Sequence, residues 1–442
     1  MTPKQYRRGL VWFRADLRLD DAVALHAALD RCEEVVPVYV WDPLWEGEWS
    51  ADWPRMGRTG ALGWGRMSAR RRRFLEESVA GLRAGLEARG VGLWELEGPA
   101  GEVLARAAAA WGCDGGVFAA RGHCPEEAAQ EAALGQRLPC HWEEGMTLLH
   151  PDDLPFDVAD LPPVFTSFRH KVERRWEVRD PLPAPAHVPV PGAGLPAAVA
   201  LRATASLAVD GRSLFPFPGG EAHAWARMAH FLEGSGAIAH YKQTRNGLLA
   251  IDDASRLSPY LAVGALSPRR LHAEIRAFEA RHGATDDTYW MIFELLWRDY
   301  FRFAAMQAGP ALFRKPPKGS GDSRARRAFE SWCAGTTGHA WVDAHMRELA
   351  ATGYMTNRGR QNVASYLVHD LGVSWTWGAA WFEHHLLDFD AASNTGNWQY
   401  LAGVGADPRP QRKFNMEKQA ADYDPDGAYR RRWQDRAPDP TP

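Results

Sequence analysis

The segment around Glu294 and Trp297 carries residue types that could bind a planar ligand. The two residues are three positions apart, so on a helix they share one face. A carboxylate beside an indole on an inward face could hydrogen-bond to such a ligand and stack against it. The alternative is a surface glutamate beside a core tryptophan. Ser255 and Ser258 stand where hydroxyl and free backbone N–H groups meet at a predicted helix start, which suits a phosphate group or simply caps the helix.

Charged residues in two further segments suggest a buried ion pair. Arg358 and Arg360 fall on different faces of a predicted helix, so one can point inward and the other toward solvent or a phosphate. An inward arginine needs an anionic partner, because an unpaired buried charge is very costly, and Asp388 is a candidate. Residues 388–400 are weak helix formers and predict a shaped loop around a ligand, with an exposed Asx turn as the alternative.

A basic, turn-like segment at residues 407–416 contains Arg409, Arg412 and Lys413. These side chains could contact phosphates, or they could form an ordinary solvated surface. The net charge of the chain is −3, so any nucleic-acid binding must come from a local basic surface of this kind.

The composition is that of a globular protein outside the membrane. The chain has 442 residues, 45% of them hydrophobic and 24% charged, and this length predicts two domains. It has no apolar run of about 18 residues and no signal-peptide pattern at its start, so we expect a cytoplasmic protein. The five cysteines form no CxxC pair, and we expect no metal site and no disulfide framework. The 20 tryptophans indicate a large helical core, stacking on a cofactor, or an electron path.

Residues 8–150 alternate between strand-like and helix-like segments. Apolar runs at 9–13, 35–41, 91–96 and 117–120 predict strands, and residues 21–30, 66–89, 102–111 and 125–136 predict helices. This order predicts a parallel sheet covered on both faces, in a Rossmann-like α/β domain over residues 1–150. No GxGxxG turn follows the first strand, so the dinucleotide-binding fingerprint is absent.

Residues 151–218 are rich in proline, which opposes helices and central strands and predicts a long connector over the surface. Only residues 164–176 look helical. Helical periodicity dominates residues 219–442, so we expect an all-α second domain. The segments that carry this periodicity are 221–234, 268–282, 288–307, 340–352, 358–370 and 376–387.

The order of these motifs resembles the photolyase/cryptochrome family over nearly the whole chain. The segments that carry the resemblance are WFR-x-DLRL near the start, E-x-x-WR, TNRGRQN and DFD-AASNTGNWQY. Further segments are similar to the DASH cryptochrome branch in particular, namely LLHPDDLPF, VFTSFRHKVE, YKQTRNGLL, NRGRQNVASYL and DPRPQRKFNMEKQ.

The resemblance implies an FAD bound in a bent shape within the helical domain. Arg360 and Asp388 would form an ion pair over the isoalloxazine ring, and Asn394 would face the flavin N5, which favours a repair-competent flavin. Ala254 stands where the family often has threonine, so one hydroxyl contact is lost. The implied cofactor-binding residues are Tyr241, Ser255, Leu257, Ser258, Arg360, Asp388, Asp390 and Asn394, with Trp290 as a further wall residue.

On the substrate side, the resemblance implies that Glu294 and Asn357 hydrogen-bond the damaged bases while Trp297 and Tyr400 stack against them. The lesion must leave the base stack to reach the flavin. Tyr400 is usual in DASH members, which prefer single-stranded DNA, where other cyclobutane-dimer enzymes often have tryptophan. The implied phosphate contacts are Arg358, Arg409, Arg412 and Lys413.

The family photoreduces its flavin through a chain of tryptophans, and here Trp398 matches the proximal member and Trp375 the middle one. No aromatic residue occurs at 319–324, where the distal member is expected. Either another aromatic ends the path or photoreduction in vitro is poor. The candidates for another end are Trp332, Tyr354, Trp377 and Trp381.

The resemblance also implies a methenyltetrahydrofolate antenna in the groove between the domains, where Glu126 or Glu127 is the nearest match to the family's glutamate.

The implied activity is blue-light-driven repair of cyclobutane pyrimidine dimers, preferably in single-stranded DNA, by a monomer. The alternative is a light receptor without repair activity, although the chain stops shortly after residues 429–433 and shows no long signalling tail. Repair of six-four photoproducts is a third option, but it needs a histidine, and the matched positions hold Glu294, Asn357 and Tyr400.

Overall fold

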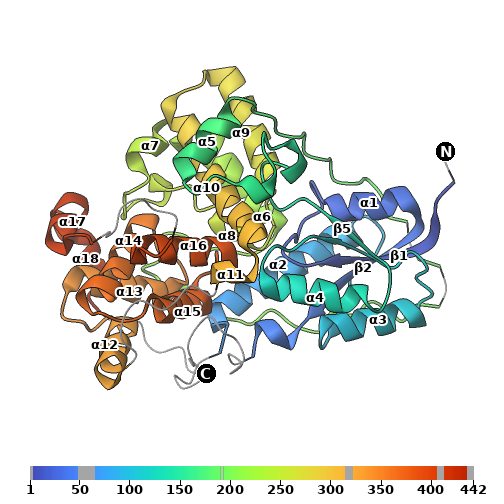
Figure 1. Cartoon of the computed structure of the whole chain (residues 1–442), viewed down its shortest axis with the longest axis horizontal. Coiled ribbons are helices and arrows are strands. Elements are labelled where there is room, and N and C mark those ends of the chain that lie inside the picture. Colours follow the sequence, from blue (N-terminus) through green and yellow to red (C-terminus); the bar gives the residue numbers. More distant parts are fainter. Residues whose placement is uncertain are drawn as a thin grey trace.

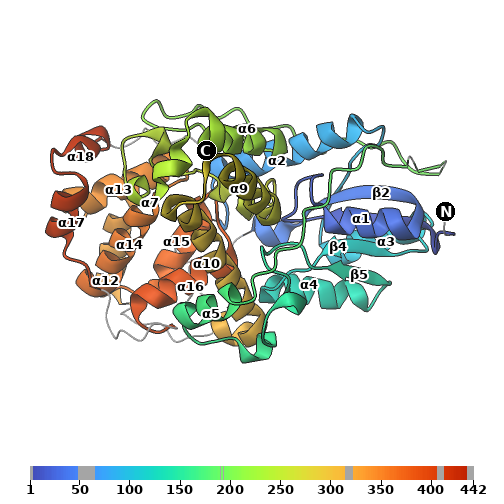
Figure 2. The same cartoon turned by 90° about the horizontal axis from the view of Figure 1, so that it is seen from above.

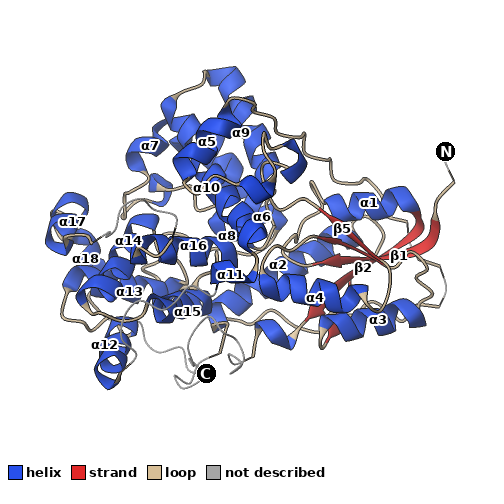
Figure 3. Ribbon diagram, viewed as in Figure 1, coloured by secondary structure: helices blue, strands red, loops and turns tan. Residues whose placement is uncertain are grey.

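The computed structural model describes residues 3–47, 65–189, 191–192, 194–313, 322–405 and 413–435. A sheet with its covering helices occupies one end, and the helices that follow residue 220 occupy the other (Figures 1 and 3). The predicted α/β and all-α halves are therefore confirmed. Every helix in the described part of the chain is too short or too polar to span a bilayer.

The N-terminal half is a five-stranded parallel sheet in the order β3-β2-β1-β4-β5. Val11 and Phe13 of β1 pack with α1 and α2, whereas Leu10 and Trp12 pack with α3 and α4, so both faces are covered as predicted (Figure 2). The elements are β1 (Tyr6–Phe13), α1 (Val23–Arg31), β2 (Cys32–Trp41), α2 (Ala69–Glu87), β3 (Trp94–Glu97), α3 (Ala100–Ala110), β4 (Val117–Ala120), α4 (Pro125–Gly135) and β5 (Cys140–Glu143).

Strand β5 has no counterpart among the predicted strands. Its residues are half-buried and include one charged and one histidine side chain, so the segment lacks the apolar run that identifies a central strand. It pairs only with β4, as expected of a strand at the edge of the sheet.

The regular elements described in the second half are helices. The long helix α10 lies at its centre and contacts α5, α7, α9, α11 and α16. The helices are α5 (Phe165–Glu173), α6 (Glu221–Ala229), α7 (Tyr241–Thr244), α8 (Ser258–Ala262), α9 (Pro268–His282), α10 (Asp286–Ala308), α11 (Pro310–Phe313), α12 (Ser323–Cys333), α13 (Ala340–Thr352), α14 (Asn357–Ser365), α15 (Trp375–His385), α16 (Ala391–Ala402), α17 (Met416–Tyr423) and α18 (Ala428–Arg432).

The prediction of a shaped loop over residues 388–400 is wrong for most of the segment. Only residues 388–390 are non-helical, and the rest forms α16. Asp390 caps this helix, because its carboxylate accepts a hydrogen bond from the Ser393 backbone N–H at 2.8 Å. Trp398 and Leu401 are buried against neighbouring helices, and this packing outweighs the low helix propensity of the sequence.

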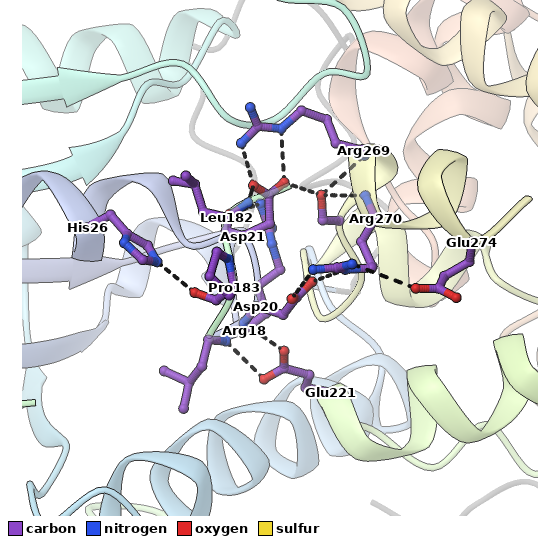
Figure 4. A network of polar contacts seen from close by, with 12 residues as sticks. Arg18, Asp20, Asp21, His26, Leu182, Pro183, Glu221, Arg269, Arg270 and Glu274 are labelled. Carbon is purple, nitrogen blue, oxygen red and sulfur yellow. Dashed lines mark hydrogen bonds and ion pairs between the residues drawn. The ribbon is translucent and has the colours of Figure 1, made fainter. Parts of the chain in front are cut away.

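Polar groups of the loop after β1 join the two halves (Figure 4). The Asp21 carboxylate receives both Arg269 and the Ser267 hydroxyl from the start of α9. Next to it, Asp20 binds Arg270 through two hydrogen bonds of 2.8 and 2.9 Å. Asp20 and Asp21, which directly follow the DLRL motif, therefore fix the helical half onto the sheet.

Candidate functional site

One cavity of about 290 Å³ lies among the helices of the second half. Its walls come from α7, α8, α10, α14, α15 and α16 and from residues 388–390. Ligand sites commonly have volumes from about 300 Å³ upward. The cavity brings together ten of the predicted site residues, namely Tyr241, Ser255, Ser258, Glu294, Asn357, Arg360, Asp388, Asp390, Asn394 and Trp398.

The predicted ion pair between α14 and the segment before α16 is present. Arg360 Nη2 lies 2.7 Å from Asp388 Oδ2, and the same oxygen accepts the Ser258 hydroxyl at 2.6 Å. Arg360 is further held by the Met355 carbonyl oxygen. On the other face of α14, the Arg358 guanidinium lies 4.7 Å from the Tyr423 ring, so the two arginines diverge as the helical spacing requires.

Two buried polar atoms of the cavity lining have no hydrogen-bond partner within the described protein. They are Asp388 Oδ1, an acceptor, and Trp398 Nε1, a donor. Buried polar groups are nearly always satisfied in native proteins. Their presence in one wall fits a bound polar cofactor that completes these hydrogen bonds.

Besides Arg245, two arginines that the sequence reasoning did not single out line the cavity, Arg256 and Arg298. Arg298 donates to the carbonyl oxygens of Met146 and Leu261, and burial lowers its pKa to about 10, so it stays charged at neutral pH. Arg256 has a left-handed backbone with φ of 60°. Neither arginine forms a salt bridge with a carboxylate of the described residues, and their charge suits a diphosphate.

Asp390 and Asn394 are both oriented by partners inside the protein. Asp390 pairs with Arg302 of α10. Burial by itself raises the pKa of Asp390, but Arg302, Arg298 and the hydrogen bonds from Ser393 together hold it below its usual value. Asn394 Nδ2 donates to the Ala379 carbonyl oxygen of α15 at 3.0 Å. A carbonyl can only accept, so this bond leaves Asn394 Oδ1 as the acceptor that is still available.

Glu294 has a partner that the motif analysis missed, the guanidinium of Arg245. Burial raises the pKa of Glu294, although Arg245 opposes this shift. Arg245 belongs to the YKQTRNGLL segment. Its position four residues after Tyr241 is the one sequence signal that could have identified it as a site residue.

The predicted stacking residues lie beside the cavity lining. Trp297 stacks on Phe165 of α5 with ring centroids 3.7 Å apart and an angle of 13°. Tyr400 meets Trp297 edge to face at 6.1 Å, so the two predicted stacking residues are neighbours.

Several predicted residues lie away from this lining. Leu257 is completely buried in the core, Trp375 is buried at the start of α15, and Trp290 stacks on Phe293. Lys413 forms a salt bridge of 2.7 Å with Asp370. Arg409 and Arg412 lie outside the described residues.

A second cavity of about 170 Å³ lies between the two halves, and Glu126 and Glu127 line it. Both glutamates already have partners. Glu126 forms a buried salt bridge of 2.8 Å with Arg66, and Glu127 accepts hydrogen bonds from the backbone N–H groups of His123 and Cys124. No cluster of side chains suited to a metal ion occurs in the part of the chain that the structure describes.

Comparisons with known proteins agree with this geometry. A family model described as the FAD binding domain of DNA photolyase matches residues 290–437, and one described as DNA photolyase matches residues 9–186. The Cryptochrome DASH of Gloeobacter violaceus is 42% identical over 434 residues, which cover 96% of this chain and 85% of that protein.

Two solved structures are similar over nearly the whole chain. The cryptochrome of Synechocystis sp. has a TM-score of 0.89 at 37% identity, with 98% of this chain and 89% of that chain covered. A class III photolyase from Agrobacterium tumefaciens has a TM-score of 0.81 at 30% identity, with 98% and 87% covered. The chain therefore belongs to the photolyase/cryptochrome family, in its cryptochrome DASH branch, and contains the FAD-binding domain of that family.

Proposed function

We propose that this protein repairs cyclobutane pyrimidine dimers by blue-light-driven electron transfer from FAD, with a preference for single-stranded DNA. The observation that carries the proposal is that Glu294 and Asn357 line the same cavity as Arg360, Asp388 and Asn394. Groups suited to damaged bases and groups suited to a flavin thus share one space, as electron transfer between cofactor and lesion requires.

The cavity side chains would bind FAD through its charged and polar parts. Arg256 and Arg298 would balance the diphosphate, with Tyr241 and Ser255 beside it. The pair of Arg360 with Asp388 and the capping residue Asp390 would hold the flavin ring. When bound in its reduced form, FAD supplies the electron that light transfers to the dimer and that returns after the cyclobutane bonds split.

Asn394 supports a reduced cofactor. Its Nδ2 gives one of its two hydrogens to the Ala379 carbonyl oxygen, and its Oδ1 would accept a hydrogen bond from a flavin N5 that carries hydrogen. An aspartate at this position could exchange a proton with N5, and an asparagine cannot.

Glu294 suits a hydrogen-bonding role toward the damaged base, because its carboxyl group lines the cavity and is oriented by Arg245. Asn357 adds an amide in the same wall. Neither group acts as a nucleophile in this proposal.

The aromatic residues beside the cavity favour a single-stranded substrate. One face of Trp297 is covered by Phe165, so a base can stack only on its opposite face or against Tyr400. Stacking on aromatic side chains together with nearby positive charge is typical of proteins that bind single strands. We assign the phosphate contacts to Arg358, Arg409, Arg412 and Lys413.

The second cavity is the proposed site of a methenyltetrahydrofolate antenna. The aromatic side chains in its lining, Trp12, Trp41 and Trp45, support this proposal more strongly than the two glutamates, which already have partners. We further propose domains at residues 1–150 and 219–442 joined by a connector at 151–218, a monomeric state and a cytoplasmic location.

Replacement of Glu294 tests the proposed repair. We expect Glu294→Ala protein to retain FAD but to lose at least about tenfold in repair rate, since a tenfold loss corresponds to only about 1.4 kcal/mol. The measurement is light-dependent repair of a thymine-dimer oligonucleotide, single-stranded and double-stranded, after the FAD content has been read from the absorption spectrum. Asp286→Ala, an exposed change at the start of the same helix, is the control. Unchanged repair in Glu294→Ala protein would contradict the proposal.

A light receptor without repair is the second candidate, since relatives in this branch are named cryptochromes. Wild-type protein that holds FAD but repairs neither substrate would favour it. Six-four repair has no support in the cavity, because no histidine is among its described lining residues.

A further inference from the structure

Trp398 has aromatic neighbours that do not belong to the predicted chain through Trp375. Its ring centroid lies 6.4 Å from that of Trp332 on α12. Trp332 stacks on Phe329 at 5.8 Å, and Phe329 lies 5.3 Å from Trp377 on α15. Trp332 is completely buried and Trp377 is half-buried, so this series of rings leads from the cavity wall toward the surface.

The need for such a series comes from the sequence. Residues 314–328 contain no aromatic side chain, so the distal tryptophan expected after Trp375 is missing. We propose that electrons reach the cavity through Trp377, Trp332 and Trp398, with Phe329 as the contact between the two outer indoles. This inference rests on the proposed FAD function and adds the route by which that cofactor is reduced.

Each transfer along the relay moves one electron inward. Trp398 gives an electron to the light-excited flavin, Trp332 refills Trp398, and Trp377 refills Trp332. Trp377 then loses its indole proton to water. A thiol reductant in solution restores both the electron and the proton, and two of the resulting thiyl radicals combine to a disulfide. Phe329 is harder to oxidise than an indole and is not itself oxidised.

The surroundings of the two indoles fit this direction of transfer. Trp332 Nε1 donates to the Val363 carbonyl oxygen at 3.0 Å, and the partial negative charge of that oxygen stabilises a positive charge on the ring. A carbonyl is too weak a base to keep the proton, so the positive charge stays mobile at Trp332. Trp377 can lose its proton to water because it is half-exposed, which traps the charge there and prevents its return.

The other aromatic candidates fit the relay less well. Tyr354 lies 4.9 Å from the Arg256 guanidinium and 5.6 Å from that of Arg360, and both positive charges oppose its oxidation. Trp381 lies against His384 and His385. Trp381 is on the same helix as Trp377 and is also half-buried, so it offers a matched control.

The test is photoreduction of the FAD-containing protein under blue light with dithiothreitol as the thiol. The variants are Trp377→Phe, Trp332→Phe, Trp375→Phe and the control Trp381→Phe, each checked for FAD content by absorbance. We expect Trp377→Phe and Trp332→Phe to lose most of the photoreduction rate, while Trp375→Phe and Trp381→Phe retain it. Transient absorption should show a long-lived neutral tryptophanyl radical in wild type that is lost in Trp377→Phe.

The outcomes separate the relay from the function on which it rests. Wild-type protein that binds no FAD would contradict both. If wild-type protein binds FAD and repairs dimers, and Trp377→Phe protein photoreduces its FAD at the wild-type rate, the relay alone is overturned. If Trp375→Phe protein loses photoreduction and Trp377→Phe protein keeps it, the relay is overturned and electrons pass through Trp375. Because Trp377 is half-exposed, its replacement by phenylalanine tests the relay even if Trp332→Phe fails to fold.

Discussion

At the scale of single residues, Tyr429 connects two buried titratable groups of α13. Its hydroxyl lies 2.7 Å from both His345 Nδ1 and Glu348 Oε2. Burial lowers the pKa of His345 to about 3 and raises that of Glu348 to about 7. The histidine is therefore neutral at physiological pH, and the single phenol proton serves Glu348. Arg256 and Arg360 of the cavity wall lie close enough to act on the charge of Glu348.

This cluster makes stability depend on pH. Folded protein keeps the Glu348 proton up to about pH 7, whereas the unfolded side chain releases it near its usual value of 4.5. The folded state thus binds more protons in this window, and its free energy of unfolding falls as the pH rises through it. His345, whose pKa is lowered, has the opposite effect on stability, so the contribution of Glu348 is read from the difference between variant and wild type. We expect the free energy of unfolding of Glu348→Gln protein, relative to that of wild type, to rise in urea unfolding from about pH 5 to pH 8. Parallel profiles for the variant and wild type would contradict the assignment.

At the scale of elements, α16 depends on Asp390 at its start. Asp390→Ala removes a cap, typically worth about 1 kcal/mol, and leaves the buried Arg302 without its carboxylate. The matched control is Asn415→Ala at the start of α17. This change removes only a cap, the 3.0 Å hydrogen bond that Asn415 Oδ1 accepts from the Lys418 backbone N–H. We expect the free energy of unfolding and the FAD content to fall more in Asp390→Ala protein. Equal losses in both variants would show that Arg302 does not need this partner.

At the scale of the whole molecule, the two halves are held together by the contacts of Asp20 and Asp21 in Figure 4. Asp21→Ala leaves the buried Arg269 unpaired, and breaking a buried pair typically costs about 3–5 kcal/mol. Asp153→Ala, which breaks the more exposed pair with Arg179, should change the midpoint of urea unfolding little. A separate early transition in Asp21→Ala protein would show the halves parting before they unfold, and a transition like that of wild type would exclude this role.

The sequence alone predicted the regular elements and the motif residues. Apolar runs identified four of the five strands, because both faces of the sheet are buried. Helical periodicity identified six segments of the second half, because one buried face imposes a local repeat. Arg360 could be paired with Asp388 by reasoning, since a buried arginine requires an anion. The prediction failed at β5 and α16, where burial and capping decide the structure and local propensity does not.

Tertiary structure alone decided which distant groups meet. Nothing in the sequence joins Arg245 to Glu294, Arg302 to Asp390, or Trp398 to Trp332, because these pairs lie on separate helices whose packing sets their distances. The same packing leaves Asp388 Oδ1 and Trp398 Nε1 buried without partners in the described protein. The sequence thus determined which side chains are available for chemistry, and the packing of helices around α10 decided that they share one cavity.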